Sequence, residues 1–235
     1  MTETLMRSTA EQDYLKQIYL LQEGSGRATT QLLAERLGVK PPSVTAMIRR
    51  LAEDEDGPLV MHTPYRGVEL TPRGLAVALE MLRHHRLIEL FLSELLDVPW
   101  DQVHGEAERL EHVISEELEE RIAAKLGYPT VDPHGDPIPS REGIMPVRDL
   151  CRLTDMPAGV TGRIARIEQQ DEAVLQYLAS LGLTLDALVR VVAIAPFGGV
   201  VTVEVEGSDG SLRHAIGEGL AERVLVQHSE SDLPA

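Results

Sequence analysis

The sequence has little of several features that mark common protein classes. It contains one cysteine, Cys151, in 235 residues, which excludes an internal disulfide framework. No apolar run approaches the roughly 18 residues that cross a bilayer, and the first residues show no basic-then-apolar signal pattern. Aromatic residues make up only 3%, so Leu, Val, Ile and Ala must form most of the core. We expect a cytoplasmic protein with no membrane partner.

Motifs of several enzyme classes are also missing. The sequence has no HExxH helix of a zinc protease, no serine elbow and no phosphate-binding glycine loop. Di-iron carboxylate bundles place Glu and His three residues apart, whereas Glu108 and His112 are four apart. We therefore expect a protein that is not an enzyme and has no small-molecule substrate.

Basic charge is scarce, since the net charge is -16, and this is unusual for a nucleic-acid-binding protein. The excess of acidic over basic side chains differs along the chain. Residues 1–75 carry nine basic and ten acidic side chains, residues 76–140 carry five and fourteen, and residues 141–235 carry eight and fourteen. The first segment is nearly neutral and can present a basic face. The acidic middle segment would suit a hard cation, although a solvated acidic surface explains most of these charges equally well.

Hydrophobic periodicity predicts a winged helix-turn-helix at the start of the chain. Apolar residues recur at helical spacing in three segments, and two short β-type runs follow with a turn between them. Helix, helix, turn, helix and hairpin is the order of a winged helix-turn-helix. The predicted helices cover residues 11–22, 29–38 and 43–54, and the predicted strands cover residues 59–62 and 67–71.

Beyond Pro72 the pattern changes twice. It is helical to about Leu126, with a break near Asp97, and five prolines in 129–146 then predict a linker or an extended connection. Short β-branched runs interrupted by one helix, over about 168–181, predict a small β-barrel. The fold class is therefore mainly α with a small β domain. We expect domains at 1–74, 75–140 and 147–228, with a linker at 141–146.

The third predicted helix is the candidate for reading DNA. In a helix-turn-helix the second helix of the motif enters the major groove with its first residues on base edges. The helical positions expected to face outward, together with the tip of the wing, are Lys40, Pro42, Ser43, Thr45, Ala46, Arg49, Arg50 and Arg66. Arg49 and Arg50 lie further along the helix and are better placed for phosphate. The alternative is a helical bundle with a surface hairpin and no role in DNA binding.

Four of the eight histidines fall between residues 84 and 112, among many carboxylates. His85 and Glu89 are four apart and share a helical face. A second face is predicted to carry His104, Glu108, Glu111 and His112. Two such faces opposite each other would form a cage of nitrogen and oxygen ligands, which suits manganese, iron(II), cobalt or zinc. The alternative is that these residues are solvated pairs on exposed helices.

Together these segments resemble the diphtheria-toxin-repressor family, and its manganese-transport-regulator branch most closely in the metal ligands. The resemblance is carried by QDYLKQIY (12–19), LAERLGVKPPSVTAMIRRL (33–51), YRGVELTPRG (65–74), RHHRLIELFL (83–92) and VHGEAERLEHVISEELEERI (103–122). It implies a winged helix-turn-helix, a helical dimerisation domain and a C-terminal SH3-like β-barrel. The stretches GLTLDALVRV (182–191) and APFGG (195–199) resemble the ferrous-transport-A type of SH3-like domain.

The resemblance also implies two metal sites. The primary site would consist of Asp13, Glu108, Glu111 and His112. The ancillary site would consist of His85, Glu89 and His104, completed by Glu172 or Gln176. Asp13 and Glu108 stand where iron-type members have methionine and cysteine, which favours manganese over iron. Lys16 stands where the manganese branch has a second glutamate, which favours a separate ancillary site over a closely spaced metal pair.

The function implied is that of a metal-dependent transcriptional regulator. We expect a homodimer on a palindromic operator, with recognition helices about 34–36 Å apart, repressing metal-uptake genes. The expected cofactor is Mn²⁺; Fe²⁺ is also possible, and Co²⁺, Zn²⁺ or Cd²⁺ would substitute in vitro. The alternative is a metal-binding protein-interaction module that does not bind DNA.

Overall fold

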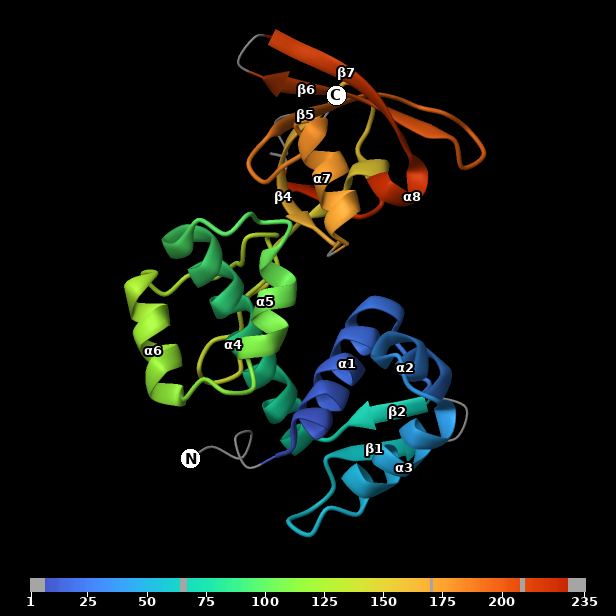
Figure 1. Ribbon diagram of the computed structural model, residues 1–235. Coiled ribbons are helices and arrows are strands. Elements are labelled where there is room, and N and C mark those ends of the chain that lie inside the picture. The colour runs from blue at the N-terminus through green and yellow to red at the C-terminus, as the bar shows by residue number, and fades with distance from the viewer. Residues whose placement is uncertain (1–6, 64–66, 170, 208–209, 228–235) are drawn as a thin grey trace. The chain divides into compact units, whose positions relative to one another are not determined.

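The computed structural model describes residues 7–63, 67–169, 171–207 and 210–227. The chain divides into two compact units (Figure 1). The first comprises Met1–Ile88, Ala107–Pro129 and Ile138–Met145, and the second comprises Glu89–Glu106, Thr130–Pro137 and Pro146–Ala235. Helices α4 (Pro72–Leu96) and α5 (Val103–Leu110) each contribute residues to both units.

The first unit begins with three helices and a two-stranded hairpin, which confirms the predicted winged helix (Figure 1). The hairpin is antiparallel, with Val60 opposite Leu70 and Thr63 opposite Gly67. The elements are α1 (Thr9–Ser25), α2 (Thr30–Leu37), α3 (Pro41–Ala52), β1 (Val60–Thr63) and β2 (Gly67–Leu70). Arg66, the predicted tip of the wing, lies outside the described residues.

Local signals in the sequence set these helix ends. Ser8 and Glu11 form a capping box at the start of α1, and Thr29 accepts a hydrogen bond from the Leu32 amide at the start of α2. Gly26 and Gly38 end the two helices in the left-handed conformation, at φ values of 72° and 64°, which glycine adopts without strain. The turn between α2 and α3 therefore has a defined geometry.

One hydrophobic core joins the three helices to the hairpin. It includes Leu15 and Ile18 of α1 and Val44 and Ile48 of α3, all of them buried. The Val68 amide of the hairpin also donates to the Ala28 carbonyl at 2.8 Å, before α2. Because α1 and α3 share this core, a change in the position of α1 carries α3 with it.

The helical region after the hairpin consists of α4, α5 and α6 (Glu116–Lys125). None of the described helices is long and apolar enough to cross a membrane. The prediction that Glu111 and His112 continue the face of His104 on one helix is wrong, because α5 ends at Leu110. The following residues form a turn, and Ser115 starts α6 by accepting a hydrogen bond from the Leu118 amide.

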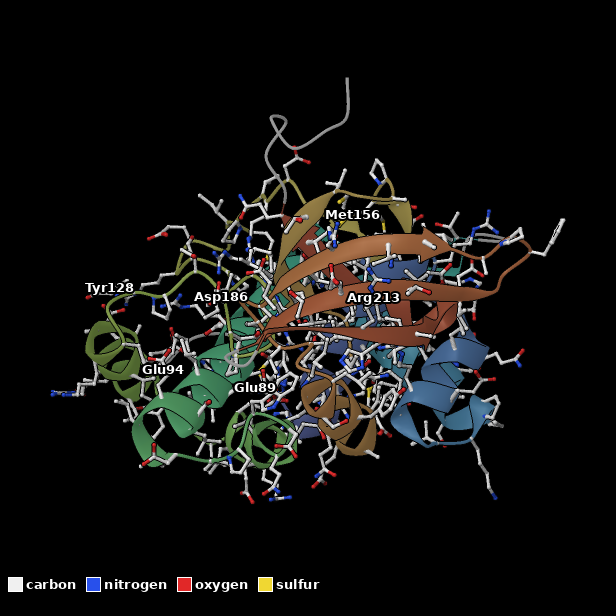
Figure 2. All side chains as sticks on the ribbon, turned by 90° about the horizontal axis from the view of Figure 1, so that it is seen from above. Glu89, Glu94, Tyr128, Met156, Asp186 and Arg213 are labelled. Atoms are coloured by element: carbon white, nitrogen blue, oxygen red, sulfur yellow. The ribbon has the colours of Figure 1, made fainter. Side chains whose placement is uncertain are left out.

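The second unit is built on an antiparallel sheet in the order β3-β8-β4-β5-β6-β7, covered in part by α7 (Glu172–Ser180). The remaining elements are β3 (Cys151–Arg152), η2 (Leu153–Asp155), β4 (Thr161–Ile167), β5 (Leu188–Ile194), β6 (Val200–Gly207), β7 (Gly210–Gly217), α8 (Glu218–Ala221) and β8 (Val224–Gln227). Strand β7 was not predicted, because most of its side chains are exposed and show no apolar alternation. Arg213 of β7 donates instead to Glu204, directly opposite on β6, at 3.3 Å (Figure 2).

The proline-rich residues 130–137 are ordered against β4 rather than forming a loose connection. The Ile167 amide donates to the His134 carbonyl at 2.8 Å, and Arg166 pairs with Asp136 at 2.6 Å. Gly135 has a φ of 82°, and a Cβ there would lie 2.1 Å from the Ala165 carbonyl oxygen. The segment is therefore fixed on the sheet by its backbone.

Two helical glycines give opposite expectations for a glycine-to-alanine change. A Cβ on Gly74 would lie 2.0 Å from the Leu59 backbone oxygen, whereas a Cβ on Gly105 would meet no atom within 4 Å. We expect Gly74→Ala to lower the free energy of unfolding by about 1–3 kcal/mol through overpacking, and Gly105→Ala to raise it by about 0.5–1 kcal/mol. Urea denaturation of both variants measures this. Equal stability of the two would contradict the close approach at Gly74.

Candidate metal centre

Three predicted ligands converge in the first unit. Asp13, Glu111 and His112 place one ligand atom each within 4.8 Å of one another. The Nε2 atom of His112 lies 3.2 Å from Asp13 Oδ1 and 3.3 Å from Glu111 Oε1. Asp13 belongs to α1 of the winged helix, whereas Glu111 and His112 belong to the turn after α5. The arrangement can hold a divalent ion through two carboxylates and one imidazole.

Gln12 orients the imidazole of His112, and its role was not predicted from the sequence. The His112 Nδ1–H donates to Gln12 Oε1 at 2.6 Å, so the Nε2 lone pair faces Asp13 and Glu111. Gln12 is only 2% exposed. Hydrogen bonding of the second ring nitrogen is the usual way in which proteins fix the tautomer of a metal-binding histidine. The ligand atoms suit a metal ion, and the hydrogen bond from His112 to Gln12 orients the imidazole for metal binding.

Glu111 is the most constrained of these ligands. It is 1% exposed, its Oε1 lies 2.5 Å from Lys16 Nζ, and its Oε2 lies 2.5 Å from His85 Nδ1. Burial by itself would raise the pKa of Glu111, but the His85 hydrogen bond and the Lys16 charge together outweigh it and hold the pKa below its usual value. The carboxylate is therefore ionised and already has a cation, Lys16, within the protein.

Glu108 does not join this group. It is exposed on α5, and the converging trio of described residues is Asp13, Glu111 and His112. Its role as a fourth ligand stays a prediction. His85, expected in the ancillary site, hydrogen-bonds to Glu111 and lies one helical turn before Glu89 on α4.

A second group of ligands lies in the other unit. Glu89 of α4 is fully buried, and its Oε1 lies 3.0 Å from His104 Nδ1 (Figure 2). Its Oε2 lies 3.8 Å from His134 Nδ1, and ligand atoms of Glu89, Asp132 and His134 lie within 4.8 Å of one another. The structure therefore brings together the predicted residues Glu89 and His104, and ligand atoms of these two and of His85 lie within 4.8 Å of one another. It adds Asp132 and His134, which were not predicted.

His134 was missed because it lies in the proline-rich segment interpreted as a connection. Its Nε2–H donates to the Trp100 carbonyl at 2.9 Å, and its ring lies 5.6 Å from the Trp100 ring. Burial tends to lower the pKa of His134, but the Glu89 and Asp132 carboxylates prevail and raise it to about 9. The signal in the sequence was the alternation of Asp132, His134 and Asp136 within that segment.

Glu172 and Gln176 do not belong to the converging groups found among the described residues. Both lie on α7, where Gln176 Nε2 donates to Glu172 Oε1 at 3.2 Å and to Asp101 Oδ2 at 2.9 Å. Their predicted part in an ancillary site stays a prediction.

The predicted DNA-reading side chains of α3 and of its N-cap Lys40 are exposed, and the remaining one, Arg66, lies outside the described residues. Lys40, Pro42, Ser43, Thr45, Ala46, Arg49 and Arg50 are exposed. Val44, Ile48 and Leu51 form the opposite, buried side. Arg49 pairs with Glu53 and Arg50 with Glu11, each at 3.0 Å. The Arg49–Glu53 pair is exposed and contributes at most about 1 kcal/mol, so DNA phosphate can replace Glu53, whereas the Glu11 carboxylate is buried.

A winged helix whose first helix shares a carboxylate–imidazole cluster with the following helical region defines a metal-dependent DNA-binding protein. Three family models match the chain in this order. They are described as the iron dependent repressor N-terminal DNA binding domain, over residues 6–68, the iron dependent repressor metal binding and dimerisation domain, over residues 71–140, and the FeoA domain, over residues 151–228. The chain belongs to the iron-dependent repressor family.

Individual relatives agree with this assignment. The iron-dependent repressor IdeR of Mycobacterium tuberculosis is 35% identical, with 83% of this chain and 88% of that protein covered. The diphtheria toxin repressor of Corynebacterium diphtheriae is 32% identical, with 85% and 90% covered. A solved manganese-dependent transcriptional repressor in complex with manganese is 42% identical. It has a TM-score of 0.85 and covers 93% of this chain and 100% of its own.

Lys16 and a metal ion would compete for the same oxygen of Glu111. We expect Lys16→Met to destabilise the metal-free protein by up to about 3–5 kcal/mol, because it removes one partner of a buried ion pair. Mn²⁺ should then raise the melting temperature of this variant more than that of the unmodified protein. Thermal melts with and without Mn²⁺ measure both effects, and Lys125→Met, at an exposed position, is the control. Equal Mn²⁺-induced shifts would show that Lys16 does not compete.

Proposed function

We propose that this protein is a manganese-dependent repressor that binds operator DNA as a homodimer and controls metal-uptake genes in the cytoplasm, without enzymatic activity. The observation that carries the proposal is the convergence of Asp13 with Glu111 and His112. A metal ion bound by these three residues would link the DNA-binding helices directly to the helical region that follows.

In the metal-free protein Lys16 pairs with Glu111. A divalent ion would take the place of this ammonium group and bind Asp13 of α1 together with Glu111 and His112 of the turn after α5. Because α1 and α3 share one hydrophobic core, the position of the recognition helix is fixed as well. The metal thus stabilises one of two pre-existing arrangements of the DNA-binding helices. It can change the DNA affinity by no more than the ratio of its own affinities for the two arrangements.

The donor atoms support manganese as the cofactor. Asp13, Glu111 and His112 offer oxygen and nitrogen ligands and no sulfur, which suits Mn²⁺ and also admits Fe²⁺, Co²⁺, Zn²⁺ or Cd²⁺. We include Glu108 as a further ligand of the primary site. We also propose an ancillary site at Glu89 and His104, with His85 one turn earlier on α4. The similarity to a manganese-dependent repressor agrees with this choice of ion.

We propose that residues 1–74 bind DNA, residues 75–140 dimerise and bind metal, and residues 147–228 form the SH3-like domain. Exposed apolar side chains support a dimer surface on the helical region. Leu110 is 38% exposed, Val113 is 73% exposed and Leu118 is 46% exposed, all within nine residues of chain. Symmetric dimers are the commonest assemblies, and they match palindromic DNA sites.

The main test is operator binding by the chelator-treated protein, measured by fluorescence anisotropy with and without Mn²⁺. We expect tight binding only with Mn²⁺. Asp13→Asn should abolish the response, because it removes one ligand charge, while Glu23→Gln, an exposed change on the same helix, should keep it. A normal Mn²⁺ response of Asp13→Asn would reject the mechanism. Metal binding without DNA affinity at any salt concentration would favour a protein-interaction module.

The role of α3 is tested by salt dependence. Each phosphate contact steepens the fall of DNA affinity with salt. We expect Lys40→Ala to weaken binding to all sequences about equally and to reduce the slope of log K against log salt by about 1. Lys125→Ala, on α6, is the matched control and should leave the slope unchanged. An unchanged slope for Lys40→Ala would place this lysine outside the DNA interface.

A further inference from the structure

The beginning of α1 contacts both α3 and the candidate metal centre. Asp13 is one of the converging ligands, and Gln12 orients His112. Glu11, the residue before Gln12, pairs with Arg50 in the last turn of α3, where Glu11 Oε1 lies 3.0 Å from Arg50 Nε. An arginine predicted to contact DNA is thus bound to the same short segment that carries a metal ligand.

Glu11 is held in place independently of Arg50. Its side chain is 7% exposed, and its Oε2 atom accepts hydrogen bonds from the Ser8 amide at 3.0 Å and from the Ser8 hydroxyl at 2.9 Å. These bonds belong to the capping box at the start of α1. The carboxylate therefore cannot follow the Arg50 guanidinium to a new position without uncapping the helix.

Arg50 is the movable partner of this pair. Its side chain is 65% exposed, and in the part of the chain that the structure describes its ion pair is with Glu11. A guanidinium has five N–H donors and binds carboxylate and phosphate with the same geometry. Phosphate and Glu11 can therefore bind Arg50 through the same N–H groups.

The surroundings of the pair are unfavourable for phosphate. Glu11 and Arg50 line a cavity of about 690 Å³, and its lining carries three arginines and five carboxylates. Asp54, one of these carboxylates, pairs with both Arg7 and Arg73. Because negative charge is in excess here, a phosphate group gains little by approaching Arg50 while the guanidinium stays beside Glu11. Arg50 has to leave this carboxylate in order to bind DNA.

We propose that Glu11 competes with DNA phosphate for Arg50 and so restrains the DNA affinity of the protein. The inference rests on the proposed function, in which α3 contacts the operator. Phosphate contacts carry no base sequence information, so the restraint acts on operator and random DNA alike. By linkage, a protein that binds DNA less tightly needs more Mn²⁺ to occupy its operator. Glu11 thus helps to set the metal concentration at which the protein responds.

The test is a double-mutant cycle on DNA affinity, measured by fluorescence anisotropy at saturating Mn²⁺ over a range of salt concentrations. Glu11→Gln removes the charge but keeps the capping box, which accepts glutamine as well as glutamate. We expect it to tighten binding to operator and random DNA by about fivefold. It should also steepen the slope of log K against log salt by about 1, because Arg50 gains a phosphate contact. In an Arg50→Gln background the same change should alter neither quantity.

Glu23→Gln is the matched control, since it is an exposed change on the same helix with the same effect on net charge. It should leave the salt slope unchanged. Equal affinity and slope for Glu11→Gln and this control would overturn the proposal, as would an effect of Glu11→Gln that persists without Arg50. Weaker binding with a shallower slope would also overturn it, because Glu11 would then position Arg50 for phosphate instead of withholding it.

Measurements without Mn²⁺ separate this result from the proposed function. An unmodified protein that binds its operator equally well with and without Mn²⁺ contradicts the proposed function, whatever the effect of Glu11→Gln. A normal Mn²⁺ response together with unchanged DNA affinity of Glu11→Gln overturns only the role of Glu11. The absence of DNA affinity from every variant would overturn both.

Discussion

The buried carboxylate of Glu111 is the constraint on which the metal centre depends. A carboxylate that is 1% exposed must be paired, since an isolated buried charge is prohibitively costly. Two helices supply its partners. Lys16 comes from α1 and His85 from α4. The backbone carbonyl of Glu111 also holds His84. One residue thus ties the first helix of the winged helix to the long helix that follows it, before any metal arrives.

Lys16 already neutralises Glu111, so the candidate metal site of the metal-free protein does not carry the full negative charge of its two carboxylates. A metal ion must displace an ammonium group from the shared oxygen, and the free energy of that displacement is subtracted from the intrinsic affinity. An internal cation of this kind would make metal binding weaker than it would be at three unpaired ligands. It also gives the metal-free protein a defined, paired state in place of mutually repelling carboxylates.

The sequence allowed much of this to be predicted where local chemistry decides the structure. Thr29 and Gly38 mark the ends of α2, and apolar spacing marks the buried side of α3. Asp13 could be assigned only by resemblance, since no local pattern shows that α1 meets a turn about a hundred residues later. Glu111 and His112 were predicted on a helical face but lie in the turn between α5, which ends at Leu110, and α6, which begins after its N-cap Ser115. His134 was overlooked because the prolines around it were interpreted as a connection. The backbone of this segment instead hydrogen-bonds to β4.

The ion pairs of Arg49 with Glu53 and Arg50 with Glu11 have a kinetic consequence. Arg49 is covered by Glu53, which follows α3, and Arg50 by Glu11 of α1, and the chain as a whole carries a charge of -16. Binding of random chromosomal DNA has to break these pairs and overcome the repulsion between phosphate and a chain of charge -16. This repulsion would lower the share of metal-free molecules held on nonspecific DNA. Release from bulk DNA would then delay the response to metal less than it would in a protein of basic net charge.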